Sequence, residues 1–260
     1  MDEQKSSLEL GRKNALGFFV AQVLWYELLA CASIGTEPRM PYRTWLDADC
    51  INMVNLMGCE HWMLEVIGDI ASLDATAAKL HDEQIFEMIT GCEHKLRRGI
   101  DAVEAKTAAH QPQSNSFSDL DCQRRQTRTY YVTLAFATTA RLLLNIIKQA
   151  ESSSEPCVGE SLNAIVDQLI VILNQAAEIM SLRGLVWPIC IAGSLANAAQ
   201  QEQISGIMNV VASGGDTSFG NCDSVMGVLT YCWRNRTGDG TNAKPWRTAM
   251  AAMGHYVLLI

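Results

Sequence analysis

The stretch Leu185-Val-Trp-Pro-Ile-Cys-Ile-Ala-Gly-Ser194 decides the fold, because it is an apolar run that Trp187-Pro188 interrupts. Proline lacks a backbone N–H and fixes φ, so Pro188 predicts that a helix begins or kinks at this point. Outward from this stretch, apolar residues recur at helical spacing, and almost nothing alternates as a strand does. The sequence therefore predicts an all-α fold.

We expect one multi-helix bundle that forms a single domain over residues 1–260. Residues 1–13 should be a disordered tail, and the polar residues 106–126, with Pro112 and several serines, should form a long exposed loop. Gly159 or Ser161 could cap the helix that follows a serine-rich connection. The segments in which we expect the helices are 14–34, 46–73, 82–105, 127–149, 161 onward, 182–199, 223–233 and 246–260.

The composition narrows the class of protein. Hydrophobic residues make up 48% of the chain and charged residues only 18%, which favours a bulky apolar interior, an apolar cavity or an apolar partner surface. A net charge of −8 argues against direct nucleic-acid binding, because phosphate contacts need a concentrated basic face. Nine scattered cysteines, an odd number, indicate a reducing intracellular compartment rather than a disulfide framework.

One segment, 15–35, has the apolar length of a membrane span or signal peptide. Gln22 and Glu27 lie in its middle, and an acid near the centre of a bilayer costs several kcal/mol. We therefore expect a buried helix of a soluble protein, with no membrane span.

Several short motifs follow one another in an order that is informative as a set. They are Trp25-Tyr26-Glu27-Leu28-Leu29-Ala30, Thr36-Glu37-Pro38, Met57-Gly58-Cys59, Ile67-Gly68-Asp69-Ile70, Tyr130-Tyr131, the Trp187-Pro188 stretch, the helix ending at Trp233, and Leu258-Leu259-Ile260. In this order the chain resembles the fungal-specific transcription factor regulatory domain of zinc-cluster regulators. The resemblance implies a helical regulatory body. Family members usually also carry a DNA-reading cluster of six closely spaced cysteines, whereas no two cysteines here lie closer than nine residues.

The tetrapeptide Gly-Cys-Glu-His occurs twice, at residues 58–61 and 91–94. On a helix, residues two apart diverge by about 200°, so one copy cannot chelate a metal from a single face. A zinc site would require both copies to come together. We predict no metal site.

Two groups of polar residues could carry chemistry. Glu27 has apolar neighbours on nearly every side, and Arg141 is a plausible partner, so a structural ion pair competes with a catalytic acid. His61, Glu65 and Asp69 are each one helical turn apart. A carboxylate beside an imidazole suits proton transfer, but a solvated polar stripe fits the same spacing.

Large aromatic side chains are placed on the predicted core helices. They could line a cavity for a hydrophobic ligand or simply pack the core, and the sequence favours neither. These aromatic residues are Trp25, Tyr26, Trp62, Tyr130, Tyr131 and Trp187.

Two functions fit these observations. The first is a cofactor-free cyclase of cycloaddition (Diels–Alderase) type in fungal terpenoid or polyketide biosynthesis, which needs only a shaped apolar cavity and a few donors. The second is a non-DNA-binding transcriptional regulator or ligand-sensing accessory of such a pathway.

We favour the cyclase slightly, with a hydrophobic small molecule as partner, a homodimer left open, and a cytoplasmic location, or a nuclear one for the regulator. No cofactor is expected. The predicted catalytic residues are Glu27, His61, Tyr131 and Arg141, and the predicted substrate-binding residues are Trp25, Trp62, Tyr130 and Trp187.

Overall fold

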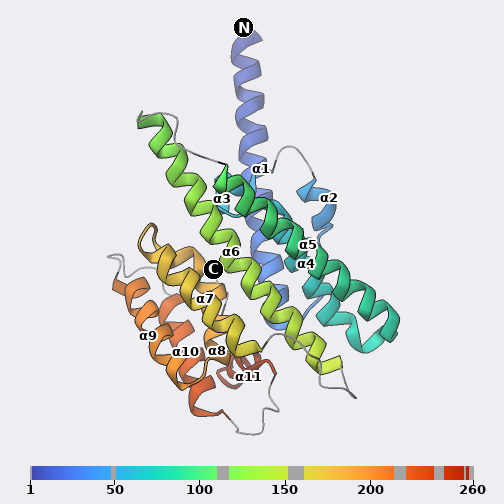
Figure 1. The fold of residues 1–260 in the computed structure, drawn as a ribbon. Coiled ribbons are helices and arrows are strands. Elements are labelled where there is room, and N and C mark those ends of the chain that lie inside the picture. The colour runs from blue at the N-terminus through green and yellow to red at the C-terminus, as the bar shows by residue number, and fades with distance from the viewer. Residues whose placement is uncertain are drawn as a thin grey trace.

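The computed structural model describes residues 2–47, 51–109, 117–151, 161–213, 221–236, 243–254 and 256–257, and their regular structure is entirely helical (Figure 1). The all-α prediction is confirmed. The helices are α1 (Asp2–Ile34), α2 (Tyr42–Leu46), α3 (Met53–Met57), α4 (His61–Thr76), η1 (Ala77–Lys79), α5 (Asp82–Ala108), α6 (Phe117–Glu151), α7 (Leu162–Ala177), η2 (Leu182–Leu185), α8 (Val186–Leu195), α9 (Ala198–Ser213), α10 (Asn221–Arg234) and α11 (Pro245–Ala252).

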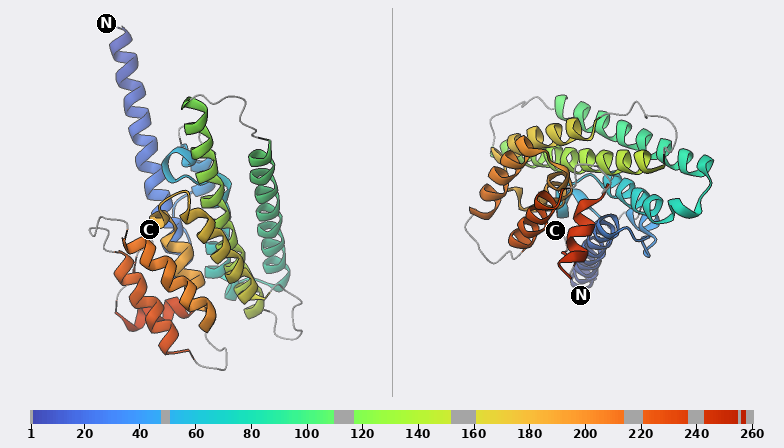
Figure 2. Two further views of the ribbon diagram at one scale, coloured as in Figure 1. Left: turned by 60° about the vertical axis from the view of Figure 1, so that its left-hand side comes forward. Right: turned by 90° about the horizontal axis from the view of Figure 1, so that it is seen from below.

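The long helix α6 joins two groups of helices. It packs against α4 and α5 from the first half of the chain and against α7 and α8 from the second half. Helix α1 packs against α4, and its N-terminal part extends beyond the rest of the molecule (Figures 1 and 2). The C-terminal helix α11 packs against α8 and α10.

Helix α8 is the buried centre of the second group. Pro188 lies in its first turn, where a backbone N–H has no partner within the helix, so proline is tolerated there. All ten residues of α8 are buried. A Cβ at Gly193 would lie 2.9 Å from Leu229 of α10 and 3.1 Å from Ile204 of α9, so this glycine permits both helices to approach α8 closely. Pro188 predicted that a helix begins or kinks here, and α8 begins at Val186, directly after η2. The predicted helix over 182–199 is therefore divided into η2, α8 and the start of α9.

The segment 46–73, predicted as one helix, contains the end of α2, all of α3 and most of α4. Asn52 begins α3 by accepting a hydrogen bond from the backbone N–H of Asn55 at 3.0 Å. Gly58 ends α3 with φ of +66°, a left-handed conformation that glycine adopts without strain. The apolar period continues through this turn, so periodicity alone does not reveal it.

Two predicted irregular segments are largely helical. Residues 2–13 belong to α1 rather than to a disordered tail, because glutamate, glutamine, lysine and leucine all favour helix. Of the predicted loop 106–126, residues 106–108 end α5 and residues 117–126 begin α6. Pro112 and residues 110–116 lie outside the described residues.

The two Gly-Cys-Glu-His copies have different backbone conformations. Gly58 and Cys59 lie in the turn between α3 and α4, whereas Gly91 and Cys92 lie inside α5. Both cysteine side chains are buried. The repeated letters are therefore not a structural repeat.

By length and composition alone, residues 14–34 of α1 and 121–151 of α6 could cross a membrane. In the fold, 72% of the apolar window of α6 is buried, as is typical of a central core helix, against 44% for that of α1. Helix α1 therefore presents a substantial part of its apolar surface outward.

Candidate functional site

Three aromatic side chains meet in the interior, one each from α1, α6 and α8. The ring of Phe136 lies edge-on to Trp25, with centroids 4.9 Å apart, and stacks on Trp187 at 5.5 Å with a 9° angle between planes. Trp187 has 0% of its surface exposed, so no void large enough for water touches it. Trp25 and Trp187 are predicted as cavity walls. In the structure both rings pack against the ring of Phe136.

The end of α1 is held by α11 through its free carbonyl groups. Ser33 O accepts hydrogen bonds from Trp246 Nε1 at 2.8 Å and Arg247 Nε at 2.7 Å, and Ala32 O accepts one from Arg247 Nη2 at 2.8 Å. Arg247 also pairs with Asp74 of α4 at 2.6 Å. Because these carbonyls have no partner within α1, the guanidinium both caps the helix and ties it to α4.

Glu27 and Arg141, predicted as an ion pair, have different partners. Glu27 Oε1 accepts hydrogen bonds from the backbone N–H groups of Arg39 at 2.9 Å and Met40 at 3.2 Å, so it fixes the loop after α1. Its Oε2 is buried and accepts no hydrogen bond from the described residues. Arg141, on α6, donates to Gln168 of α7. The pairing prediction is wrong because the two side chains face different neighbouring elements.

Asp69 is the centre of a buried polar network rather than part of a proton relay with His61. Its Oδ1 accepts hydrogen bonds from Tyr42 Oη at 2.7 Å and Arg43 Nη2 at 2.6 Å, and its Oδ2 accepts one from Lys95 Nζ at 2.8 Å. His61 is exposed at the start of α4. The network therefore joins α2, α4 and α5.

The network shifts the protonation of its members. Burial, together with the hydrogen bond to Asp69, raises the pKa of Tyr42. Burial lowers the pKa of Lys95, but its hydrogen bonds to Asp69 and Glu65 outweigh that effect, and the net shift is upward. Tyr42 and Lys95 therefore stay protonated at neutral pH, as a structural network requires.

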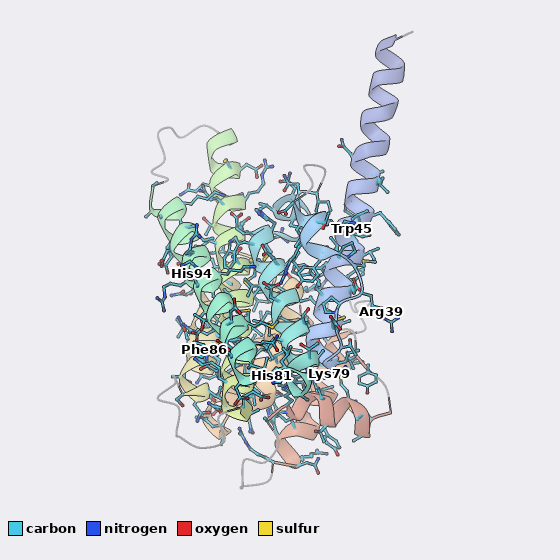
Figure 3. The ribbon with its side chains drawn as sticks, turned by 90° about the vertical axis from the view of Figure 1, so that its right-hand side faces the viewer. Arg39, Trp45, Lys79, His81, Phe86 and His94 are labelled. Atoms are coloured by element: carbon cyan, nitrogen blue, oxygen red, sulfur yellow. The ribbon has the colours of Figure 1, made fainter. Side chains whose placement is uncertain are left out.

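The remaining predicted residues do not converge on one place. Tyr130 and Tyr131 lie edge-to-face on α6 with ring centroids 5.2 Å apart. Tyr130 lines a surface groove of about 270 Å³, which Val103 also lines. Trp62 lines a different hollow of about 350 Å³. His94, on the exposed side of α5, lines the same hollow (Figure 3). The eight predicted site residues are thus spread over the core and at least two separate surfaces.

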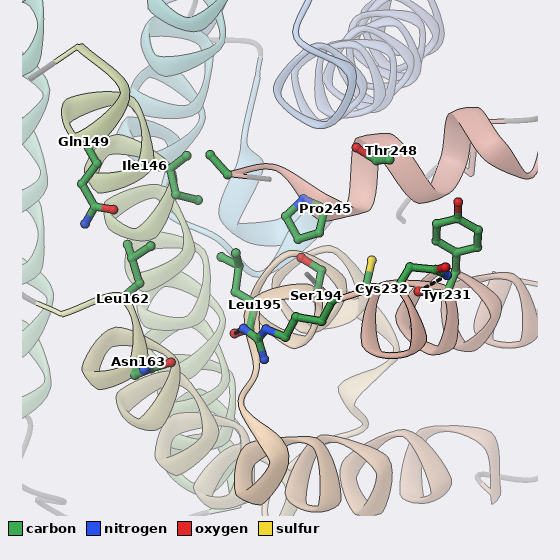
Figure 4. Close-up of a pocket in the computed structure, with 13 residues that line it drawn as sticks. Ile146, Gln149, Leu162, Asn163, Ser194, Leu195, Tyr231, Cys232, Pro245 and Thr248 are labelled. Carbon is green, nitrogen blue, oxygen red and sulfur yellow. Dashed lines mark hydrogen bonds between the residues drawn. The ribbon is translucent and has the colours of Figure 1, made fainter. Parts of the chain in front are cut away.

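A pocket that the sequence does not predict lies where the ends of α6, α7, α8 and α10 meet the start of α11 (Figure 4). We call it the α6–α11 pocket, and its volume is about 320 Å³. Its lining is partly apolar and partly polar. The lining residues are Ile146, Gln149, Leu162, Asn163, Ser194, Leu195, Tyr231, Cys232, Asn235, Arg236, Ala243, Pro245 and Thr248.

The polar groups of the α6–α11 pocket are largely committed to the fold. Arg236 Nη2 donates to Leu195 O at 2.6 Å, and Ser194 Oγ donates to Ile191 O at 2.7 Å. Burial raises the pKa of Cys232 to about 12, so its sulfur is a thiol and a poor nucleophile at neutral pH. The pocket can hold a small molecule, but the lining residues that the structure describes provide no activated nucleophile and no acid–base pair.

The comparisons with known proteins point to regulators. The family described as "Fungal specific transcription factor domain" matches residues 3–260. The transcription factor dibT of Pestalotiopsis microspora is 27% identical over 98% of this chain and 43% of its own length. A trichothecene biosynthesis transcription regulator of Trichoderma arundinaceum is 24% identical over 98% of this chain and 57% of its own length.

A third relative, the ustiloxin B cluster transcription factor ustR of Aspergillus flavus, is 24% identical over 95% of this chain and 43% of its own length. The chain thus spans about half the length of these relatives. No solved structure matches it.

These relatives contradict the prediction of a cyclase, because they are named as transcription factors or regulators. The physical reason for the error is that an apolar composition fits a packed interior as well as a cavity. At Trp25, Phe136 and Trp187 the structure has packing.

Proposed function

Because this chain belongs to the fungal-specific transcription factor domain family, we propose that it regulates the transcription of a secondary-metabolite gene cluster and acts in the nucleus. The observation that carries the proposal is the family match over residues 3–260, which includes nearly every helix. Two relatives are named for trichothecene biosynthesis and for the ustiloxin B cluster, which supports the pathway class.

The proposed regulator works through other molecules rather than by reading DNA with this domain. The net charge of −8 opposes close approach to phosphates. The densest basic cluster of the sequence is Arg124, Arg125 and Arg128, and Arg125 is paired with Asp121 at 2.8 Å. This arrangement is a solvated helix surface and supplies little free positive charge for a duplex.

We further propose that the α6–α11 pocket binds a small effector of the pathway that carries both apolar and polar groups. A volume of about 320 Å³ is at the lower end of the range for small-molecule sites. The lining brings together the ends of α6, α7, α8, α10 and α11, so a bound molecule would stabilise one arrangement of these ends. Effector binding would in this way be transmitted to α11, which holds the end of α1.

The effector proposal is tested by thermal unfolding of the purified chain with metabolites extracted from the producing culture. A ligand at ten times its Kd should raise the Tm by roughly 3–5 °C for a protein of this size. Asn163→Trp would fill the pocket from its rim and should abolish the rise. Asn174→Trp, on the exposed side of the same helix, is the matched control and should retain it. An equal rise in both variants would place the ligand elsewhere.

The regulator proposal is tested by deleting the gene and measuring transcripts of the biosynthetic genes beside it together with the metabolites of the culture. We expect the transcripts to fall several-fold and both product and intermediates to disappear. Unchanged transcripts with one accumulating intermediate would overturn the proposal. As a second arm, fluorescence anisotropy with promoter duplexes should give no sequence-specific binding by the purified chain.

A further inference from the structure

A hollow between α4 and α5 gathers basic side chains, although the chain as a whole is acidic. We call it the α4–α5 hollow, and its volume is about 350 Å³. Its lining residues are Trp62 and Glu65 from α4 and His94, Lys95, Arg98 and Gly99 from α5. The four residues of α5 form two pairs one helical turn apart, so they lie on one side of that helix, which His94 marks in Figure 3. Three basic side chains beside one acid, in a chain of net charge −8, favour an anionic ligand.

The guanidinium of Arg98 is the cation with which a ligand can pair. Lys95 Nζ donates to Asp69 Oδ2 at 2.8 Å and also to Glu65, so two carboxylates already meet its charge. Arg98 is exposed, and its guanidinium makes no hydrogen bond or ion pair with the residues that the structure describes. An arginine binds a carboxylate through two parallel N–H donors, a geometry that an ammonium group lacks. Because Arg98 and Lys95 exceed Glu65 by a single charge, a carboxylate suits the hollow better than a doubly charged phosphate.

The indole ring of Trp62 supplies an apolar wall. A Cβ at Gly99 would lie 2.5 Å from this ring, so glycine at this position lets the ring rest directly on the backbone of α5. That contact holds the half-buried ring in place between the two helices. The indole N–H of Trp62 donates no hydrogen bond to the described residues, so it is available to an acceptor on a ligand. A flat apolar group in the hollow would therefore gain contact with the ring and a donor for an oxygen atom.

From this arrangement we propose that the α4–α5 hollow binds a small aromatic carboxylate, whose ring contacts Trp62 and whose carboxylate pairs with Arg98. A volume of about 350 Å³ is at the lower end of the range for small-molecule sites, which suits a compact ligand. A polyanion such as a nucleic acid fits less well, because the net charge of −8 opposes its approach. Among the described residues, the hollow shares none with the lining of the α6–α11 pocket, so the two are separate sites.

Glu65 limits the affinity of the hollow for an anion. Its side chain is 32% exposed and accepts a hydrogen bond from Lys95, so its carboxylate competes with a ligand for the ammonium group. Glutamine at this position keeps the shape of the side chain, removes the like charge and leaves Lys95 with Asp69 as its carboxylate partner. Glu65→Gln should therefore strengthen binding, an effect that a damaged fold cannot produce.

Isothermal titration calorimetry of the full chain with sodium 1-naphthoate tests the proposal. We expect saturable binding at one site with a Kd of about 1 mM or tighter, the strength of a small fragment. Arg98→Gln should raise the Kd about fivefold or more, because the paired cation is lost. Glu65→Gln should lower it about twofold or more. Arg97→Gln is the matched control, because Arg97 is also an exposed arginine of α5 but does not line the hollow, so its Kd should be unchanged.

Circular dichroism establishes that each variant folds. Naphthalene-1-methanol, which has the same ring without the charge, and acetate, which has the carboxylate alone, should each bind about tenfold more weakly than 1-naphthoate or worse. Equal binding of either probe would overturn the proposal, as would equal effects of Arg97→Gln and Arg98→Gln or no saturable binding of 1-naphthoate. Asn163→Trp, which fills the α6–α11 pocket, should leave the Kd unchanged, and a loss of binding in this variant would place the ligand in that pocket and overturn the proposal. These measurements of affinity are independent of the transcript measurements that test regulation.

Discussion

Replacing Phe136 with alanine tests whether the interior is filled. Phe136 is 0% exposed and contacts Trp25 edge-on at 4.9 Å and Trp187 face-on at 5.5 Å. Buried Phe→Ala substitutions cost about 3–5 kcal/mol because a cavity replaces the ring. Each aromatic pair adds about 0.5–1.5 kcal/mol beyond the buried area, so we expect the upper half of that range, about 4–5 kcal/mol.

The assay is equilibrium unfolding in urea, followed by tryptophan fluorescence and by circular dichroism. Phe86→Ala is the matched control, because Phe86 is 70% exposed on α5 (Figure 3) and should change the free energy of unfolding by less than about 0.5 kcal/mol. A loss below about 1.5 kcal/mol for Phe136→Ala would refute the reasoning, because it would mean that the ring already lies beside empty space.

Three further results are expected. Asp69→Ala should lower the free energy of unfolding by about 2 kcal/mol in urea titrations, because Tyr42, Arg43 and Lys95 lose their buried acceptor. The cost is not larger because Arg43 and Lys95, the two cations, are partly hydrated. On α5, Gly91→Ala should stabilise the fold by about 0.5–1 kcal/mol. Gly99→Ala should not stabilise it, because a Cβ at residue 99 would lie 2.5 Å from the ring of Trp62. Equal effects of the two substitutions in thermal unfolding would contradict this contact. Burial raises the pKa of Cys59 from its ordinary 9.0 to about 12, so the thiol of the unfolded chain ionises first and the free energy of unfolding falls as the pH rises above 9. Between pH 7 and pH 10, the free energy of unfolding of the wild type should therefore fall by about 1.4 kcal/mol more than that of Cys59→Ala.

The periodicity of apolar residues predicted much of the fold because helix faces are local properties. The predicted helix over 82–105 corresponds to α5, and Ser161 occupies the N-cap position of α7 as one of the two residues expected there. The turn at Gly58 escaped prediction, since a single residue with positive φ breaks a helix without disturbing the apolar pattern around it.

The candidate site was harder to predict because it depends on contacts between distant segments. Glu27 was rightly singled out as an unusual acid, but its partners are backbone N–H groups of the following loop, which no residue type reveals. The α6–α11 pocket is lined from five helices, with Ile146 and Thr248 about a hundred residues apart in the chain.

The central claim, that this helical domain carries regulatory activity, is tested most directly by fusing the whole 260-residue chain to an unrelated DNA-binding module. Transcripts of a reporter gene with that module's binding sites are then measured in a fungal host. The account predicts that the fusion changes reporter transcripts several-fold relative to the module alone. A stable, nuclear fusion that leaves the transcripts unchanged would contradict it.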